Sequence, residues 1–171
     1  MSIDVDIRID PPTKHDVDVA TLTRGIRVAA ESHGYETGWI ELWITTDPSI
    51  HRVNREHLDH DYPTDVISFG YLADAGRLEG EMVVSRETAD RQAARLGVDP
   101  AEELLRYVIH GTLHIAGMDD ADAMERSQMR TAEDRVIREV RRTRPSDIGD
   151  RDMGDRDMGD RTPSFAPESA S

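Results

Sequence analysis

The chain of 171 residues contains no cysteine. This absence excludes disulfide bonds, zinc sites built on thiolates and cysteine nucleophiles. No apolar run approaches the roughly 20 residues that a membrane-spanning helix needs, and the N-terminal stretch MSIDVDIRID is too acidic for a signal peptide. We therefore expect a cytoplasmic protein without a membrane partner.

Lysine is almost absent as well, since Lys14 is the only one among 21 basic residues. Acidic residues number 35, and the formal net charge is −14. Broad nonspecific binding of nucleic acid normally needs a basic face, so no DNA partner is expected, although a locally basic groove is compatible with this composition. Two origins fit the composition equally well: a high-salt host, in which self-repulsion is screened, and a GC-rich genome that favours arginine over lysine.

Apolar residues alternate with polar ones in four short segments, a pattern typical of β-strands. These segments are 3–9, 39–46, 65–71 and 80–85. Helical periodicity and capping residues predict five helices, with Asp47, Ser85 and Asp99 as N-caps. The helices are expected at about 17–33, 48–58, 86–97, 100–117 and 122–142. This order predicts an α+β fold, in which a small mixed four-stranded sheet packs with about five helices.

The last predicted helix is amphipathic. The residues expected on its buried face are Met124, Met129, Val136, Ile137 and Val140. The composition changes after Arg144, where GDRDMGDRDMGDR repeats every five residues, a period of neither helix nor strand. We therefore expect one domain over residues 1–144 and a disordered acidic tail over 145–171.

The stretch VIHGTLHIAGMDDAD, residues 108–122, carries the chemistry. On a helix, His110 and His114 lie one turn apart on the same face, which is the spacing for two imidazoles on one metal ion. Gly117 can end the helix in a left-handed turn, and the reversed chain can bring Asp120 back towards the imidazoles. Three protein ligands leave a coordination position open for water, as in catalytic zinc sites. The alternative is a buried histidine pair that hydrogen-bonds to neighbouring backbone.

Zinc peptidases with the HExxH motif carry a glutamate directly after the first histidine as general base. Here that position is Gly111. Proteolysis is therefore the weaker hypothesis for this stretch.

The run HGTLHIAGMDD resembles the H-G-x-L-H-L-x-G-Y-D-H motif of the YbeY endoribonucleases, which are bacterial ribosomal RNA maturation factors. Two further stretches are similar to motifs of that family in the same order: NREHLDHDYPTDVISF over 54–69 and LEGEMVVSRETADRQA over 78–93. Together the three motifs cover about residues 40 to 125. The order of strands and helices agrees with the α+β fold that this resemblance implies.

The resemblance implies a metal-dependent endoribonuclease that prefers single strands. It further implies a role in maturation of the 3′ end of 16S rRNA and in ribosome quality control, with ribosomal RNA and the small ribosomal subunit as partners. The implied cofactor is one Zn²⁺ ion, and His110 and His114 match the first two ligands. Asp120 replaces the usual third histidine, and this harder donor favours Mn²⁺ or Mg²⁺ more than usual.

A second departure concerns catalysis. Many family members carry Tyr-Arg shortly before the P-T motif, and His57 and Leu58 stand at these positions here. Leucine cannot grip a phosphate, so we take His57 as the catalytic candidate, with His60, Arg52 and Arg55 as alternatives. A ribosome-assembly factor that keeps the metal but does not cleave is the rival hypothesis, followed by a zinc peptidase.

Overall fold

The computed structural model describes residues 2–12, 17–58 and 66–142, so the predicted tail 145–171 lies outside the described residues. One sheet contains the four strands β1 (Asp4–Ile9), β2 (Thr37–Thr45), β3 (Val66–Asp74) and β4 (Arg77–Ser85). The spatial order is β1-β2-β4-β3. Strand β2 is parallel to both β1 and β4, whereas β3 is antiparallel to β4. The mixed four-stranded sheet is therefore confirmed.

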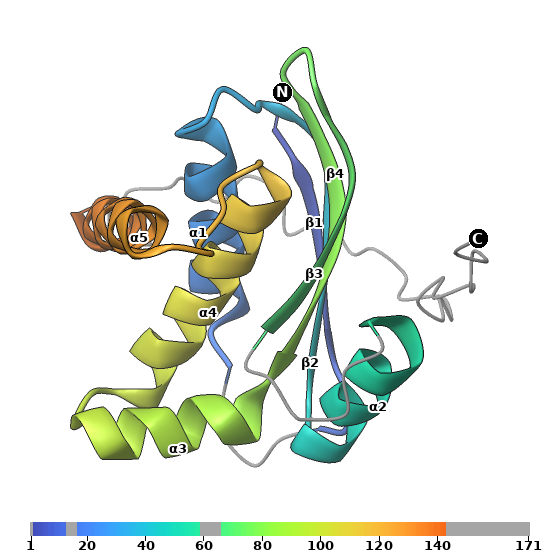
Figure 1. Cartoon of the computed structure of the whole chain (residues 1–171), viewed down its shortest axis with the longest axis vertical. Coiled ribbons are helices and arrows are strands. Elements are labelled where there is room, and N and C mark those ends of the chain that lie inside the picture. Colours follow the sequence, from blue (N-terminus) through green and yellow to red (C-terminus); the bar gives the residue numbers. More distant parts are fainter. Residues whose placement is uncertain (1, 13–16, 59–65, 143–171) are drawn as a thin grey trace.

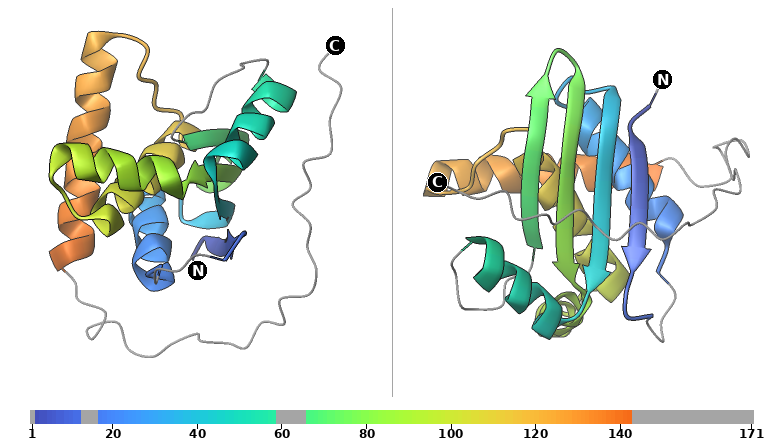
Figure 2. Two further views of the ribbon diagram at one scale, coloured as in Figure 1. Left: turned by 90° about the horizontal axis from the view of Figure 1, so that it is seen from below. Right: turned by 90° about the vertical axis from the view of Figure 1, so that its right-hand side faces the viewer.

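The described part of the chain also contains the five predicted helices. They are α1 (Val19–Glu31), α2 (Asp47–Leu58), α3 (Arg86–Leu96), α4 (Pro100–Ile115) and α5 (Ala123–Arg142). Helices α1 and α4 lie on one face of the sheet, α5 packs on these two helices, and α2 lies on the other face (Figures 1 and 2). No helix among the described residues is long and apolar enough to cross a membrane.

Helix α4 is the central helix of the fold, because it contacts the sheet as well as α1, α3 and α5. Its side chains Val108, Ile109 and Leu113 are fully buried. Gly111 allows the close approach to the sheet: a Cβ atom there would lie 2.6 Å from Sδ of Met82. Helix α4 is thereby held at a fixed position against the sheet and α5, and its polar face is fixed with it.

Strands β3 and β4 form a hairpin that is longer than the sequence pattern predicts. The turn residues Ala75 and Gly76 have φ angles of 50° and 78°. Positive φ at both central positions is the two-residue turn that matches the twist of a hairpin. Such turns usually carry Asn-Gly or Asp-Gly, so the Ala-Gly pair gave no turn signal in the sequence.

Two of the three predicted N-caps are confirmed. The side chain of Ser85 accepts a hydrogen bond from the Thr88 backbone N–H at 3.2 Å, and Asp99 accepts one from Ala101 at 2.8 Å. The third prediction is wrong, because α2 begins at Asp47 itself. The Asp47 carboxylate is held by residues of β4 and α3 instead.

The Asp47 carboxylate fastens the start of α2 to the start of α3. It accepts hydrogen bonds from the hydroxyls of Ser85 and Thr88, the latter at 2.7 Å, and from Nη1 of Arg91 at 2.6 Å. Burial alone would raise the pKa of Asp47, but the hydrogen bonds and the Arg91 charge outweigh it and hold this pKa below 3.8. The carboxylate is therefore an anchor between two helices.

Helix α5 buries most of the predicted face. Met129, Val136, Ile137 and Val140 are at most 6% exposed. The expectation for Met124 is wrong, since this side chain is 72% exposed. It stands five positions before Met129, an offset that at 3.6 residues per turn places the two side chains on different faces of the helix.

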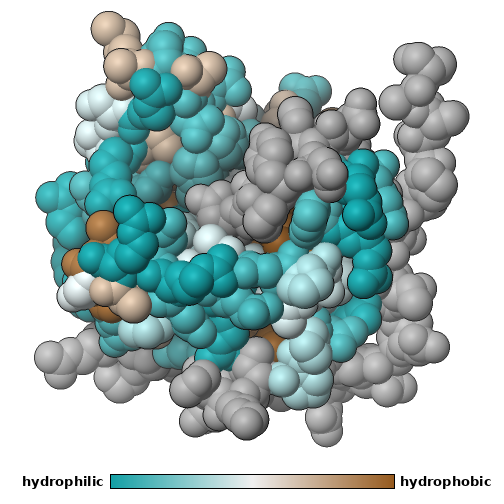
Figure 3. Space-filling view, turned by 60° about the horizontal axis from the view of Figure 1, so that its bottom comes forward, coloured by the Kyte–Doolittle hydropathy of each residue, from teal (hydrophilic) through white to brown (hydrophobic). Residues whose placement is uncertain are grey.

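The surface agrees with the large share of charged residues, which make up 33% of the chain. Hydrophilic residues dominate the face seen in Figure 3, and hydrophobic residues appear on it only in small separate patches. Charged side chains on this scale keep a protein dissolved but do not determine its fold.

Candidate metal centre

The two predicted histidines meet on α4. His110 and His114 lie one helical turn apart, and their Nε2 atoms are 3.0 Å from each other. The rings are nearly perpendicular, at 76°. Both side chains are partly buried, with exposed fractions of 23% and 27%. The two Nε2 atoms thus approach one common position that solvent can still reach.

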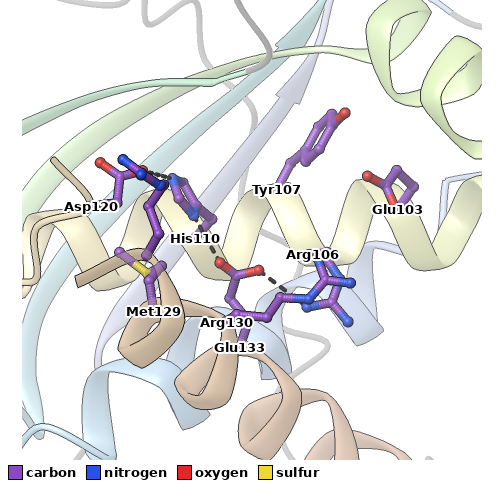
Figure 4. A pocket seen from close by; sticks show the side chains of 9 residues that line it. Glu103, Arg106, Tyr107, His110, Asp120, Met129, Arg130 and Glu133 are labelled. Carbon is purple, nitrogen blue, oxygen red and sulfur yellow. Dashed lines mark hydrogen bonds and ion pairs between the residues drawn. The ribbon is translucent and has the colours of Figure 1, made fainter. Parts of the chain in front are cut away.

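The turn after α4 brings the third residue back to this position. Gly117 adopts a φ angle of 102° and donates its N–H to the carbonyl of His114. The reversed chain places Oδ2 of Asp120 at 3.3 Å from Nε2 of His110, and Oδ1 at 3.4 Å from Nε2 of His114. Figure 4 shows the Asp120 carboxylate beside the His110 ring.

These three donor atoms fit one metal ion. They all lie within 4.8 Å of one another. Ligands at zinc-like bond lengths of about 2.0–2.2 Å in tetrahedral geometry are separated by about 3.3 Å. The two Nε2 atoms are 3.0 Å apart, and the Asp120 carboxylate comes within 3.3 Å of His110 through Oδ2 and within 3.4 Å of His114 through Oδ1. Two imidazoles and a carboxylate are also an established donor set of catalytic zinc sites. His110, His114 and Asp120 therefore form a candidate metal site.

A buried glutamate of α5 holds the first histidine in place. Oε2 of Glu133 lies 2.9 Å from Nδ1 of His110, and the Glu133 side chain is only 7% exposed. A carboxylate that accepts the Nδ1 proton leaves the Nε2 lone pair free for a metal. Figure 4 shows Glu133 between His110 and Arg106.

Arg106 completes this network. Its Nη1 atom donates to Oε1 of Glu133 at 3.1 Å and its Nη2 atom to Asp134 at 2.8 Å. Burial alone would lower the pKa of Arg106, but its hydrogen bonds with Asp134 and Glu133 raise it above the ordinary value. The guanidinium therefore stays charged and holds Glu133 in place through a hydrogen bond.

A pocket of about 260 Å³ opens beside these residues, between α4 and α5. Its lining includes His110, Asp120, Arg106, Arg126, Arg130 and Glu133. Figure 4 shows Glu103, another lining residue, at the end remote from Asp120. The candidate metal site thus lies at one end of a cavity lined mainly by charged residues.

The structure says less about the predicted catalytic histidine. His57 belongs to the last turn of α2, but its side chain, like Leu58 and all of His60, lies outside what the structure describes. Arg52 and Arg55, the other candidates of this segment, are exposed on α2. The structure therefore brings His110, His114 and Asp120 together and leaves the position of His57 relative to them as a prediction.

Sequence reasoning missed Glu133 and its partner Arg106. The signal was present, because Glu133 follows Met129 by four residues and so falls within the apolar stripe of the last helix. A charged residue at such a position needs a partner. The partner lies 27 residues earlier, and neither residue belongs to a short motif.

Comparisons with known proteins agree on one family. The family model described as endoribonuclease YbeY matches residues 13–141. A protein named endoribonuclease YbeY from Rhodopirellula baltica is 41% identical over 143 residues, which cover 77% of this chain and 74% of that protein. One of the same name from Chlorobaculum parvum is 37% identical over 135 residues, covering 79% and 95%.

A solved structure has a similar fold. The solution structure of TM1509 from Thermotoga maritima is 26% identical in sequence and has a TM-score of 0.57. The match covers 88% of this chain and 99% of that one. The α+β fold of this chain is therefore shared with almost the entire length of that solved structure.

Proposed function

The chain belongs to the endoribonuclease YbeY family, and from this premise we propose that it is a metal-dependent endoribonuclease that cuts single-stranded RNA. The observation that carries the proposal is the convergence of donor atoms from His110, His114 and Asp120, one from each residue, within 4.8 Å of one another. They stand on the histidine motif through which the sequence resembles the family. The names of the relatives supply the class of reaction.

We assign His110, His114 and Asp120 as the ligands of one divalent ion, with Zn²⁺ as the first choice. Mn²⁺ and Mg²⁺ are the alternatives, because the carboxylate of Asp120 is a harder donor than an imidazole. When bound, such an ion supplies Lewis-acid stabilisation of charge on a phosphoryl oxygen and lowers the pKa of water. The polypeptide contributes a fixed geometry: Glu133 orients His110, and Gly117 lets the chain return with Asp120.

His57 is our candidate for a direct contact with the reacting phosphate. It stands in the last turn of α2, next to the position where many relatives of the family carry an arginine and this chain has Leu58. An imidazole can donate a proton or a hydrogen bond to a phosphate oxygen. Asp47 anchors the other end of the same helix through Ser85, Thr88 and Arg91.

The proposed substrate is ribosomal RNA, at the 3′ end of the 16S rRNA. In this proposal the protein acts in the cytoplasm on the small ribosomal subunit, in rRNA maturation and in ribosome quality control. This finer assignment follows from the resemblance of the three sequence motifs. The catalytic unit is proposed to be residues 1–144, without the tail 145–171.

The peptidase hypothesis has a physical obstacle. A general base beside His110 would have to stand at Gly111, where even a Cβ atom would approach Sδ of Met82 to 2.6 Å and Cγ2 of Val66 to 3.0 Å. Position 111 faces the sheet and not the metal site. A glutamate therefore has no room there.

The proposal is tested with the metal-loaded protein and two RNAs of equal length, one spanning the 3′ end of 16S rRNA and one of unrelated sequence, each as a single strand and as a duplex. We expect cleavage of the single strands, with the ribosomal sequence preferred. A protein that binds the ribosomal strand and leaves it intact would be an assembly factor instead. Cleavage of an unstructured peptide but of neither RNA would restore the peptidase.

A further inference from the structure

The pocket beside the metal site continues along α5. His110 and Asp120 line it together with Arg126 and Arg130, and its volume is about 260 Å³. In Figure 4, residues of α4 form one wall, and Met129, Arg130 and Glu133 of α5 form the other. A ligand at the metal site therefore has direct access to the arginines of α5.

The arginines of this pocket are not equivalent. Arg106 is 14% exposed and bonds to two carboxylates, Glu133 and Asp134. Its charge is therefore neutralised within the protein. Arg106 supports His110 through Glu133, and its positive charge is already balanced by the two carboxylates.

Arg126 and Arg130, in contrast, have no carboxylate partner within the described ranges of the chain. The Nη1 atom of Arg126 donates to the uncharged backbone carbonyl of Ala121 at 3.0 Å. Arg130 forms no hydrogen bond or ion pair with any described residue, and both arginines are exposed. Two positive charges in the pocket are thus available to an anion.

Their spacing also favours an anion. Arg126 and Arg130 stand four residues apart on α5, so they share a face of the helix. Like charges at this spacing destabilise a helix. A phosphate between or beside the two guanidinium groups would remove this repulsion and accept hydrogen bonds in the bidentate geometry that arginine provides.

We propose that Arg126 and Arg130 bind a phosphate group of the RNA strand adjacent to the phosphodiester at the metal centre, so that the bound strand runs along α5. This inference rests on the proposed ribonuclease function. It assigns the ligand of the pocket as a backbone phosphate of a single-stranded nucleic acid. It also gives this strongly acidic protein a local positive site where the substrate passes.

The test is a binding titration with the metal-loaded full-length chain. The probe is a short fluorescein-labelled single-stranded RNA with methylated 2′-hydroxyls, followed by anisotropy at several salt concentrations, and a gel confirms that it stays intact. The variants are Arg126→Gln and Arg130→Gln. The matched control is Arg135→Gln, which removes an exposed arginine of the same helix that does not line the pocket.

Each pocket variant should weaken binding about tenfold at low salt, the usual loss for one charged hydrogen-bonded contact. It should also make the negative slope of log K against log salt shallower by about 0.7, the value for one phosphate of a single strand. Arg135→Gln should match the parent in both. Equal slopes for the parent and both pocket variants, or an equal loss in the control, would overturn the proposal.

Cleavage of unmodified RNA, measured beside the titration, separates this inference from the function on which it rests. If the parent cleaves RNA and the pocket variants bind RNA as tightly as the parent, the pocket assignment alone is refuted. If the parent binds RNA through the two arginines but cleaves none, the proposed function alone is refuted. A parent that neither binds nor cleaves contradicts both.

Discussion

Nδ1 of His110 lies 2.9 Å from Oε2 of Glu133, and this contact joins α4, which carries the two histidines of the candidate metal site, to the last helix α5. The other carboxylate oxygen of Glu133 accepts a hydrogen bond from Arg106 at 3.1 Å. Both oxygens of a buried carboxylate are therefore used to fix the orientation of one imidazole. The packing of α5 against α4 thereby fixes the geometry of the candidate metal site.

Replacement Glu133→Gln should weaken metal binding by about 10- to 100-fold, the usual cost of losing the carboxylate behind a histidine ligand. The shape of the side chain is kept, so the fold should survive. The measurement is a competition titration with a chelator of known affinity. Asp134→Asn is the control, because Asp134 also bonds to Arg106 but does not touch His110. Equal affinities of parent and Glu133→Gln would refute the assigned role.

The identity of residue 120 should set the metal preference. Asp120→His replaces a hard oxygen donor by an imidazole, so Zn²⁺ should bind more tightly relative to Mn²⁺ than it does to the parent. Asp120→Ala should weaken both ions by about tenfold or more, because a ligand is lost. Competition between the two ions on each protein gives the ratio. If Asp120→Ala bound both ions as the parent does, residue 120 would not be a ligand.

The Asp47 anchor predicts a pH-dependent stability. The pKa of Asp47 is lower in the folded protein than its ordinary value of 3.8 in the unfolded chain. The stability that the ionised carboxylate contributes is therefore fully present above pH 3.8 and is lost as the pH falls through the lower pKa of the folded state. Asp47→Asn should therefore cost about 1–2 kcal/mol of unfolding free energy at neutral pH, and the difference from the parent should shrink in acid. Urea unfolding at a series of pH values measures it.

Asp74→Asn is the control for that series, since Asp74 is exposed in the hairpin and makes no ion pair with a described residue. It should follow the parent at every pH. A cost of Asp47→Asn that stays constant from neutral to acidic pH would mean that the charge of this carboxylate is not what stabilises the contact.

The tail is predicted to be dispensable for folding. The buried side chains of α5 extend to Val140, so a chain that ends at Arg144 keeps the whole described core. Its melting temperature should equal that of the full chain within the error of a thermal scan. Unfolding of the shortened chain under conditions in which the full chain is stable would refute the proposed division at residue 144.

The sequence was sufficient to predict the secondary structure because its signals are local. Ser85 and Asp99 cap helices, and alternating apolar residues mark the strands. The exception at Asp47 shows the limit of a local reading. Its neighbour Pro48 suggested an N-cap, yet hydrogen bonds from Ser85, Thr88 and Arg91 on later elements take its carboxylate.

The same distinction applies to the site. His110, His114 and Asp120 fall within eleven consecutive residues, and helix geometry plus one glycine turn predicts that they meet. Glu133 reaches the site only through the packing of two helices, and nothing in its own neighbourhood specifies Arg106 as its partner. Tertiary contacts of this kind have no local spacing from which they can be predicted.

The most direct test of the account compares the parent with His110→Ala on a single-stranded RNA that spans the 3′ end of 16S rRNA. Both proteins are loaded with metal, their metal content is measured, and their folds are checked by circular dichroism. The account predicts cleavage by the parent, with its activity removed by a chelator and restored by the ion, and no cleavage by a folded, metal-poor His110→Ala. Equal cleavage by both proteins, or none by a metal-loaded and folded parent, would contradict it.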